Sequence, residues 1–277
     1  MSSVRARAWL LIGPAVAWTV FFFILPLAAM VVVSLQDHAN GGWTLANYRQ
    51  FFTDPNYFQA MVNSLEVTAW VTIVSLLLAY PFAWILAEIV PERWQRLALM
   101  LAVLPFWTSY IVRSYSWLLV LAERGVVNDA MTAMGLVDEP LRLANTRFAT
   151  VVGFTHFFVM LLTLTIFANL KQLNPNYRRA AADLGAGRLA MFFHVILPLT
   201  APGIVVGCFL TFVIAMGDYI TPQILGGNNE LLMSQLVMMQ IGRRGDFPLA
   251  SALSLILMGV VTAGYLLSAR WLKLERA

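Results

Sequence analysis

The sequence predicts an all-α membrane protein with six membrane-spanning helices, on the basis of composition, apolar segments and charge placement. Of its 277 residues, 60% are hydrophobic and 12% charged, whereas soluble domains have about 45–50% and about 25%. A soluble fold needs a charged surface that this composition does not supply. Six segments are long and apolar enough to cross a bilayer, and the basic residues between them alternate in density.

The apolar segments are close to the length of about 20 residues that a spanning helix requires. Because lipid offers the backbone no hydrogen-bond partners, such segments fold as helices. The first begins with Arg5 and Arg7, as secretion signals do, but its apolar run exceeds the roughly 7–15 residues of a signal core, so we interpret it as a retained anchor. We predict one transmembrane domain, 1–277, with spans at about 8–35, 65–87, 97–121, 148–170, 199–220 and 249–272.

Basic residues predict the orientation, since cytoplasmic segments are enriched in Lys and Arg. With the N-terminus inside, the outer loops contain six basic residues: Arg49, Arg124, Arg142, Arg147, Arg243 and Arg244. The inner segments contain eleven: Arg5, Arg7, Arg93, Arg96, Lys171, Arg178, Arg179, Arg188, Arg270, Lys273 and Arg276. Arg113 lies inside a span. The bias predicts that both termini are cytoplasmic.

The inner loop at residues 174–197 has the composition of ordered structure. Asn174 is a favourable cap and Pro175 a favourable first residue of a helix, and Gly185 and Gly187 are suited to ending it. A second short helical stretch, residues 188–197, places apolar residues on one side: Leu189, Phe192, Phe193 and Ile196. Periodicity alone leaves open that this loop is an interfacial helix lying on lipid headgroups.

Residues 180–204 read AAADLGAGRLAMFFHVILPLTAPGI. This stretch resembles the EAA loop of ABC importer permeases, whose pattern is roughly E-A-A-x-x-L-G-A, followed by I-x-L-P-x-x-x-P. The resemblance implies a coupling helix that docks in a groove of a separate ATPase subunit. The implied coupling residues are Arg179, Ala180, Ala181, Asp183, Leu184, Gly185, Ala186, Gly187 and Pro198. Arg179 stands where the family has an acid, so either the partner surface differs or a second permease subunit supplies that contact.

The resemblance covers nearly the whole chain and is greatest to permeases for spermidine and putrescine. It rests on residues 104–128 (LPFWTSYIVRSYSWLLVLAERGVVN), 217–227 (GDYITPQILGG) and 45–48 (LANY). Permeases for other amines, iron and phosphonates have similar text and remain alternatives. The resemblance implies a bacterial inner-membrane subunit without catalytic residues, with ATP and Mg on a partner ATPase dimer. It also implies a second, related permease subunit and a periplasmic or extracellular binding protein.

Five residues are candidates for the substrate path: Trp107, Tyr110, Arg113, Asp218 and Tyr219. Ionisable groups at membrane depth usually face a cavity or a partner, so Asp218 could attract a cation, or it could form a hydrogen bond at a helix end. Residues at spacings of three and four would share one helix face, either as a cation site or as an interfacial aromatic belt: Trp107, Tyr110, Arg113 and Trp117. We expect Arg113 to pair with Asp218.

Other classes of protein fit the sequence poorly. It lacks a G-x-x-x-x-G-K-[ST] phosphate-binding loop, and the dispersed His38, His156 and His194 with the single Cys208 do not form a metal or catalytic set. A net charge of +4 spread over short loops reflects topology, so nucleic acid is not an expected partner and lipid is. A secondary transporter remains a less favoured alternative, because those proteins commonly have inverted repeats and broken helices.

Overall fold

The structure is a computed structural model that describes residues 12–38, 40–227 and 230–274. The described chain is helical apart from loops, turns and one isolated bridge between Gln36 and Trp43. Its described residues divide into two compact units, one within residues 12–59 and 236–260 and the other within residues 60–235 and 261–274. The units are described separately below.

The first unit contains a long apolar helix, Ile12–Ser34, which includes the π turn η1 (Val20–Ile24) and α2 (Leu25–Ser34). It also holds α3 (Ala46–Thr53), η5 (Gln240–Arg244) and parts of α4 (Pro55–Trp84), α13 (Met233–Met239) and α14 (Phe247–Leu274). The buried Asn47 amide joins α3 to the end of α2 by donating to the carbonyl oxygens of Ser34 and Gln36, each at 2.9 Å. Such side-chain bonds satisfy carbonyls that the end of a helix leaves free.

The second unit contains the remainder of α4 and a π turn that extends it, η2 (Ile85–Ile89). Its other elements are α5 (Glu92–Val103), η3 (Leu104–Trp107), α6 (Tyr110–Leu121), α7 (Val126–Ala133), α8 (Arg147–Gln172), α9 (Pro175–Asp183), α10 (Arg188–Met191), η4 (Phe192–Ile196), α11 (Leu197–Gly217) and α12 (Ile220–Leu225).

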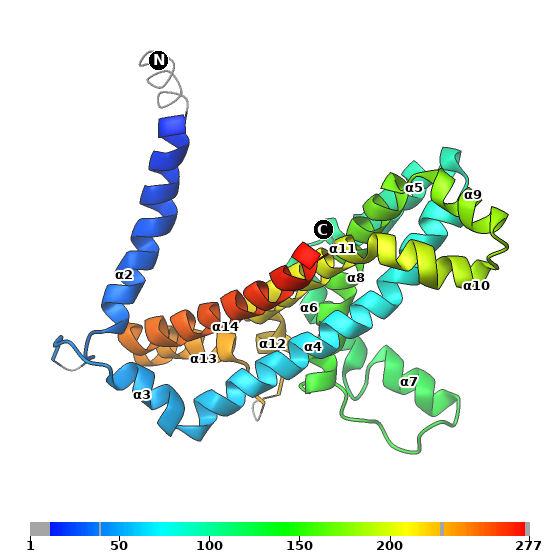
Figure 1. Cartoon of the computed structure of the whole chain (residues 1–277). Helices are drawn as coiled ribbons and strands as arrows, with labels where there is room; N and C mark the ends of the chain where they lie inside the picture. Colours follow the sequence, from blue (N-terminus) through cyan, green and yellow to red (C-terminus); the bar gives the residue numbers. More distant parts are fainter. Residues whose placement is uncertain (1–11, 39, 228–229, 275–277) are drawn as a thin grey trace, which may run out of the picture. The chain divides into compact units, whose positions relative to one another are not determined.

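The core of the second unit forms where α8 packs along α11 (Figure 1). Leu162 and Ile166 of α8 are fully buried there, together with alanines of α4. Two glycines of α11 permit the close approach: a Cβ at Gly203 would overlap the side chain of Asn169, and a Cβ at Gly207 would lie 2.9 Å from Leu162. Small residues are a recurrent means of bringing membrane helices together.

Five helices in the described chain are long and apolar enough to span a membrane: Ile12–Ser34, Pro55–Ile89, Arg147–Gln172, Arg188–Gly217 and Phe247–Leu267. A sixth span is possible as a broken pair, Glu92–Trp107 and Tyr110–Ala133, bent by 86°. The prediction of an all-helical membrane fold is confirmed. The prediction of one continuous third helix over 97–121 is wrong, and residues 8–11 of the first predicted span lie outside the described residues.

Pro105 explains the break in the third span. It is the second residue of η3 and lacks the N–H that a continuing helix would use. Thr108 and Ser109 then adopt extended ψ angles of 146° and 133°, after which α6 starts in a new direction at Tyr110. The apolar pattern crosses this point without interruption, so hydropathy alone could not locate it.

Candidate functional site

The segment between α8 and α11 forms the two short helices that the sequence predicts (Figure 1). The Asn174 side chain accepts a bond of 2.9 Å from the backbone N–H of Asn176, and Pro175 is the first residue of α9. The helix ends in a left-handed residue, Gly185, at φ +81°. The N–H of Gly185 bonds to the carbonyl of Ala182 and the N–H of Ala186 to that of Ala181. This pair of bonds is the Schellman motif, which fixes the bend between the helices.

Most of this segment is exposed, and its exposed residues include large apolar side chains. Leu184 is 89% exposed and Leu189 is 75% exposed, and Tyr177 and Phe193 are also exposed. Ala181 is the buried residue of α9. An apolar surface on a polar, charged segment is typical of a contact with another protein.

The apolar residues that the sequence places on one side of 188–197 do not all face the same way. Ile196 is buried in the core, whereas Leu189 and Phe193 are exposed.

An ion pair attaches this segment to η2, the π turn that extends α4. Arg178 Nη1 pairs with Glu88 Oε2, and the guanidinium lies 5.8 Å from the centre of the Trp84 ring. The neighbouring Arg179 is exposed, and its side chain has no ion pair or hydrogen bond within the described part of the chain. Arg178 and Glu88 are 90 positions apart in sequence, which is why sequence reasoning did not find this contact.

The second short helix does not end before the fifth span. Residues Arg188–Gly217 form one apolar helix of 30 residues, so the predicted second short helix continues into the predicted fifth span without an end at Pro198. Pro198 cannot donate a helical hydrogen bond. The π turn η4 immediately before it accommodates this residue, with the N–H of Leu197 bonded to the carbonyl of Phe192.

A second set of contacts surrounds Asp218, at the break between α11 and α12. Its Oδ1 accepts a 2.8 Å bond from the N–H of Ile220, and its Oδ2 accepts bonds from the Tyr110 hydroxyl and, at 2.9 Å, from Thr221 Oγ1. The Tyr110 and Thr221 hydroxyl oxygens are 2.6 Å apart. All these partners are neutral. In the part of the chain that the structure describes, no cation pairs with this carboxylate.

Arg113 does not pair with Asp218, contrary to expectation. It is 7% exposed. Its Nη1 donates to the Pro105 carbonyl at 3.3 Å, and its guanidinium lies 5.2 Å from the Tyr110 ring centre and 5.0 Å from that of Phe157. Aromatic faces and a carbonyl thus replace the carboxylate as partners. Tyr110 contacts both charged groups: its hydroxyl donates to the Asp218 carboxylate, and its ring faces the Arg113 guanidinium.

The aromatic face predicted for the third span is divided by the break. Trp107 lies in η3, before the bend, and is 85% exposed, whereas Tyr110 and Arg113 lie after it in α6. Tyr219 is partly exposed and is the cap residue of α12. The structure therefore brings Tyr110, Arg113 and Asp218 into one connected cluster, and it does not bring Trp107 into that cluster.

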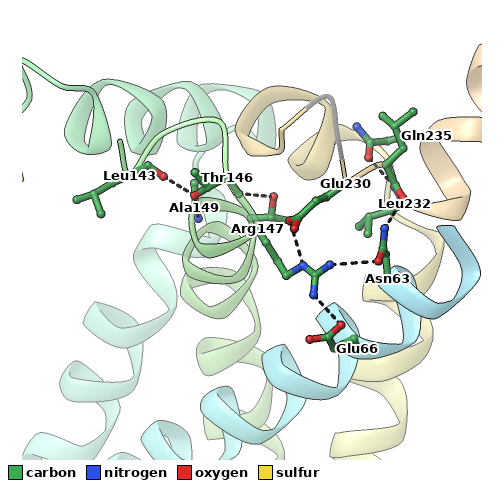
Figure 2. Close-up of polar contacts among 11 residues, drawn as sticks. Asn63, Glu66, Leu143, Thr146, Arg147, Ala149, Glu230, Leu232 and Gln235 are labelled. Carbon is green, nitrogen blue, oxygen red and sulfur yellow. Dashed lines mark hydrogen bonds and ion pairs between the residues drawn. The ribbon is translucent and has the colours of Figure 1, made fainter. Parts of the chain in front are cut away.

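A further polar cluster, which sequence reasoning missed, surrounds Arg147 at the start of α8. Figure 2 shows its guanidinium between three acceptors: Glu66 at 2.6 Å, Glu230 at 3.1 Å and Asn63 at 3.1 Å. Asn63 in turn donates to the carbonyl of Leu231 at 3.4 Å. These contacts join α4, α8 and the segment that precedes α13. A basic residue at a helix N-terminus is unfavourable because the helix dipole is positive there. The position of Arg147 in the sequence was therefore a signal that carboxylates lie nearby to compensate its charge.

Comparison with known proteins decides the family. A family model for the inner membrane component of binding-protein-dependent transport systems matches residues 60–274. The chain belongs to this permease family. The spermidine/putrescine transport system permease protein PotB of Haemophilus influenzae is 34% identical over 244 residues, covering 86% of this chain and 85% of that protein. PotB of Escherichia coli is 32% identical over 261 residues, covering 92% and 94%.

Solved structures show the same fold. A chain of a bacterial ABC transporter involved in import of the acidic polysaccharide alginate matches the permease with a TM-score of 0.79 and 17% identity, covering 97% of this chain and 96% of that chain. A chain of an amino acid ABC transporter matches with a TM-score of 0.53 and 16% identity, covering 84% and 98%. At these identities the likeness concerns the fold alone.

The permease is thus a multi-pass inner-membrane subunit of an ABC importer, and it is a transport component, not an enzyme. Within residues 12–38, 40–227 and 230–274, no group of three or more His, Cys, Asp or Glu side chains could hold a metal ion. His156 of α8 accepts a 2.8 Å bond from the Trp117 indole N–H of α6, which is a contact between helices.

Proposed function

We propose that the permease forms half of the translocation path of a polyamine importer and couples it to a separate ATPase. The relatives named for spermidine/putrescine transport support this substrate class, at 32–34% identity over most of the chain. The other half of the path is a second, related permease subunit. ATP and Mg bind to the ATPase dimer, and a periplasmic or extracellular binding protein delivers the substrate. Both termini of the permease are cytoplasmic.

The α9–α10 segment is the proposed contact with the ATPase. Its support is the exposure of Leu184 and Leu189 beside a bend fixed by the Schellman bonds at Gly185. A rigid, apolar and protruding surface can enter a groove and transmit a displacement. Because Arg188–Gly217 is one helix, motion of the segment would pass directly into the fifth span. The ion pair of Arg178 with Glu88 would carry it to α4.

The cluster of Tyr110, Arg113 and Asp218 is the proposed part of the substrate path, with Tyr219 at its edge. The observation that supports this role is the Asp218 carboxylate, whose described partners are all neutral donors. Its charge is therefore not cancelled, and an ammonium group could replace the hydroxyl groups of Tyr110 and Thr221. Trp107, which is exposed before the bend, is a proposed contact outside this cluster.

The proposal is tested by ATP hydrolysis of the assembled complex in lipid, with its binding protein, across a panel of polyamines and other small solutes. Stimulation by spermidine or putrescine alone is expected. Stimulation by another amine, by iron or by a phosphonate would keep the importer and replace the substrate. Uptake that proceeds without any ATPase subunit would support a secondary transporter instead.

A further inference from the structure

A pocket lies between the end of α4 and the α9–α10 segment, away from the Asp218 cluster. It has a volume of about 880 Å³. Its wall includes the rings of Tyr80, Trp84 and Phe192. Tyr80 and Trp84 each pack edge to face with Phe192, and in both pairs the ring centres are 5.5 Å apart. Arg178 and Arg188 also line it. The pocket therefore combines an aromatic wall with two guanidinium groups.

The charge of the pocket is positive. Glu88, which also lines it, is paired with Arg178. Arg188 is exposed, and no contact with a carboxylate is found for it in the described part of the chain. One positive charge is thus left over. Arg178 also has a buried Nε without a hydrogen-bond partner among the described residues, which is costly unless an acceptor is supplied.

The remaining lining is apolar and continues to the surface. Ile89 and Leu189 line the pocket and are both exposed. Ile89 is the last residue of a candidate membrane span of 35 residues, which is longer than the about 20 residues that cross the hydrocarbon, so this end of the helix can reach the headgroups. A small soluble anion would use the arginines but not this surface. An amphiphile with an anionic head and an acyl chain would use both.

We propose that this pocket binds one anionic phospholipid, with its phosphate at Arg188 and Arg178 and an acyl chain along Ile89. Basic pockets at the ends of membrane helices hold such headgroups in other membrane proteins. The bound lipid would lie between α4 and the α9–α10 segment and add a second connection beside the ion pair of Arg178 with Glu88. The inference is independent of the transported solute, because lipid binding is measured without transport.

The test is native mass spectrometry of the purified complete transporter, titrated with phosphatidylglycerol and with phosphatidylethanolamine. We expect preferential retention of phosphatidylglycerol, weakened about fivefold by Arg188→Gln, since a basic residue near a lipid surface contributes about 1 kcal/mol. The matched control is Arg96→Gln, which removes an exposed arginine of α5 that does not line the pocket. We expect the Arg96→Gln complex to retain phosphatidylglycerol as the unmodified complex does. Excess inorganic phosphate should not displace the lipid from either complex.

Three results would overturn the proposal. The first is equal retention of both lipids, and the second is equal phosphatidylglycerol retention by the Arg188→Gln and unmodified complexes. The third is displacement of the lipid by inorganic phosphate, which would assign the site to a free anion. Loss of the ATPase subunit from the Arg188→Gln complex, with lipid retention unchanged, is a form of the second result and would assign Arg188 to the ATPase contact.

Discussion

Tyr110 and Asp218 are 108 residues apart in sequence, and a hydrogen bond from the tyrosine hydroxyl to the carboxylate joins them. The bond connects the first residue of α6, just after the break in the third span, to the break between α11 and α12. Two helix interruptions therefore meet at one polar cluster. Breaks of this kind leave backbone and side-chain polar groups available inside a membrane protein.

Tyr110→Phe is expected to weaken this connection. The substitution removes bonds to Asp218 and Thr221 while keeping the ring that faces Arg113. We expect a loss of about 1 kcal/mol in the free energy of unfolding, measured as a lower thermal midpoint of the purified complex. Tyr115→Phe, on the exposed side of the same helix, is the control. Equal midpoints for the two variants would show that the bond does not contribute.

Asp218→Asn separates the charge of this residue from its hydrogen bonds. The asparagine oxygen can still accept from the N–H of Ile220, and its NH2 group can donate to the hydroxyl oxygens of Tyr110 and Thr221 in place of the bonds that Asp218 Oδ2 accepts. If the carboxylate attracts a polyamine, the apparent affinity for spermidine uptake should fall about tenfold or more, equivalent to about 1.4 kcal/mol. An unchanged affinity would leave Asp218 with its hydrogen-bonding role alone.

Gly185→Ala tests the bend between α9 and α10. Gly185 has φ +81°, where an alanine costs about 1 kcal/mol. Gly187→Ala is the matched control, because Gly187 has an ordinary φ of −67° and both positions have open space where a Cβ would lie. We expect Gly185→Ala to lower the ratio of solute transported to ATP hydrolysed, and Gly187→Ala to leave it unchanged. The same ratio in both variants would contradict a coupling role for the bend.

Arg147→Gln tests the cluster in Figure 2. The change leaves Glu66 and Glu230 without their shared cation. Because the cluster is partly exposed, we expect a loss of only about 1 kcal/mol in unfolding free energy, smaller at high salt. Arg124→Gln removes an exposed arginine of a neighbouring loop and should have no such effect. A loss that does not change with salt would indicate that the ion pairs are not its cause.

The sequence predicts much of the fold because the properties involved are local. Runs of apolar residues predict the spans, and Asn174, Pro175 and Gly185 predict where α9 starts and ends. The signals at α9 depend on backbone chemistry within a few residues, and the structure agrees with them. The family is shown by a model that matches residues 60–274, which include this stretch.

The long-range contacts could not be predicted in this way. The Arg113 side chain has a carboxylate within the same cluster, yet it contacts Pro105 and two aromatic rings because the break at Pro105 turns its helix. The pairing of Arg178 with Glu88 depends on how separate helices pack. Hydropathy does not change at the break in the third span, so this break was not visible in it. At Pro198 the sequence suggested a helix end that the structure does not have, because the π turn η4 lets the helix continue.

The most direct test of the central claim measures spermidine-stimulated ATP hydrolysis by the assembled complex, with the unmodified permease and with Leu184→Glu. Leu184 is 89% exposed, so a charge there should leave the fold of the permease intact. The account predicts stimulation with the unmodified permease and its loss with Leu184→Glu, because a carboxylate would enter the apolar ATPase contact. Equal stimulation with both permeases would contradict the coupling role of the α9–α10 segment.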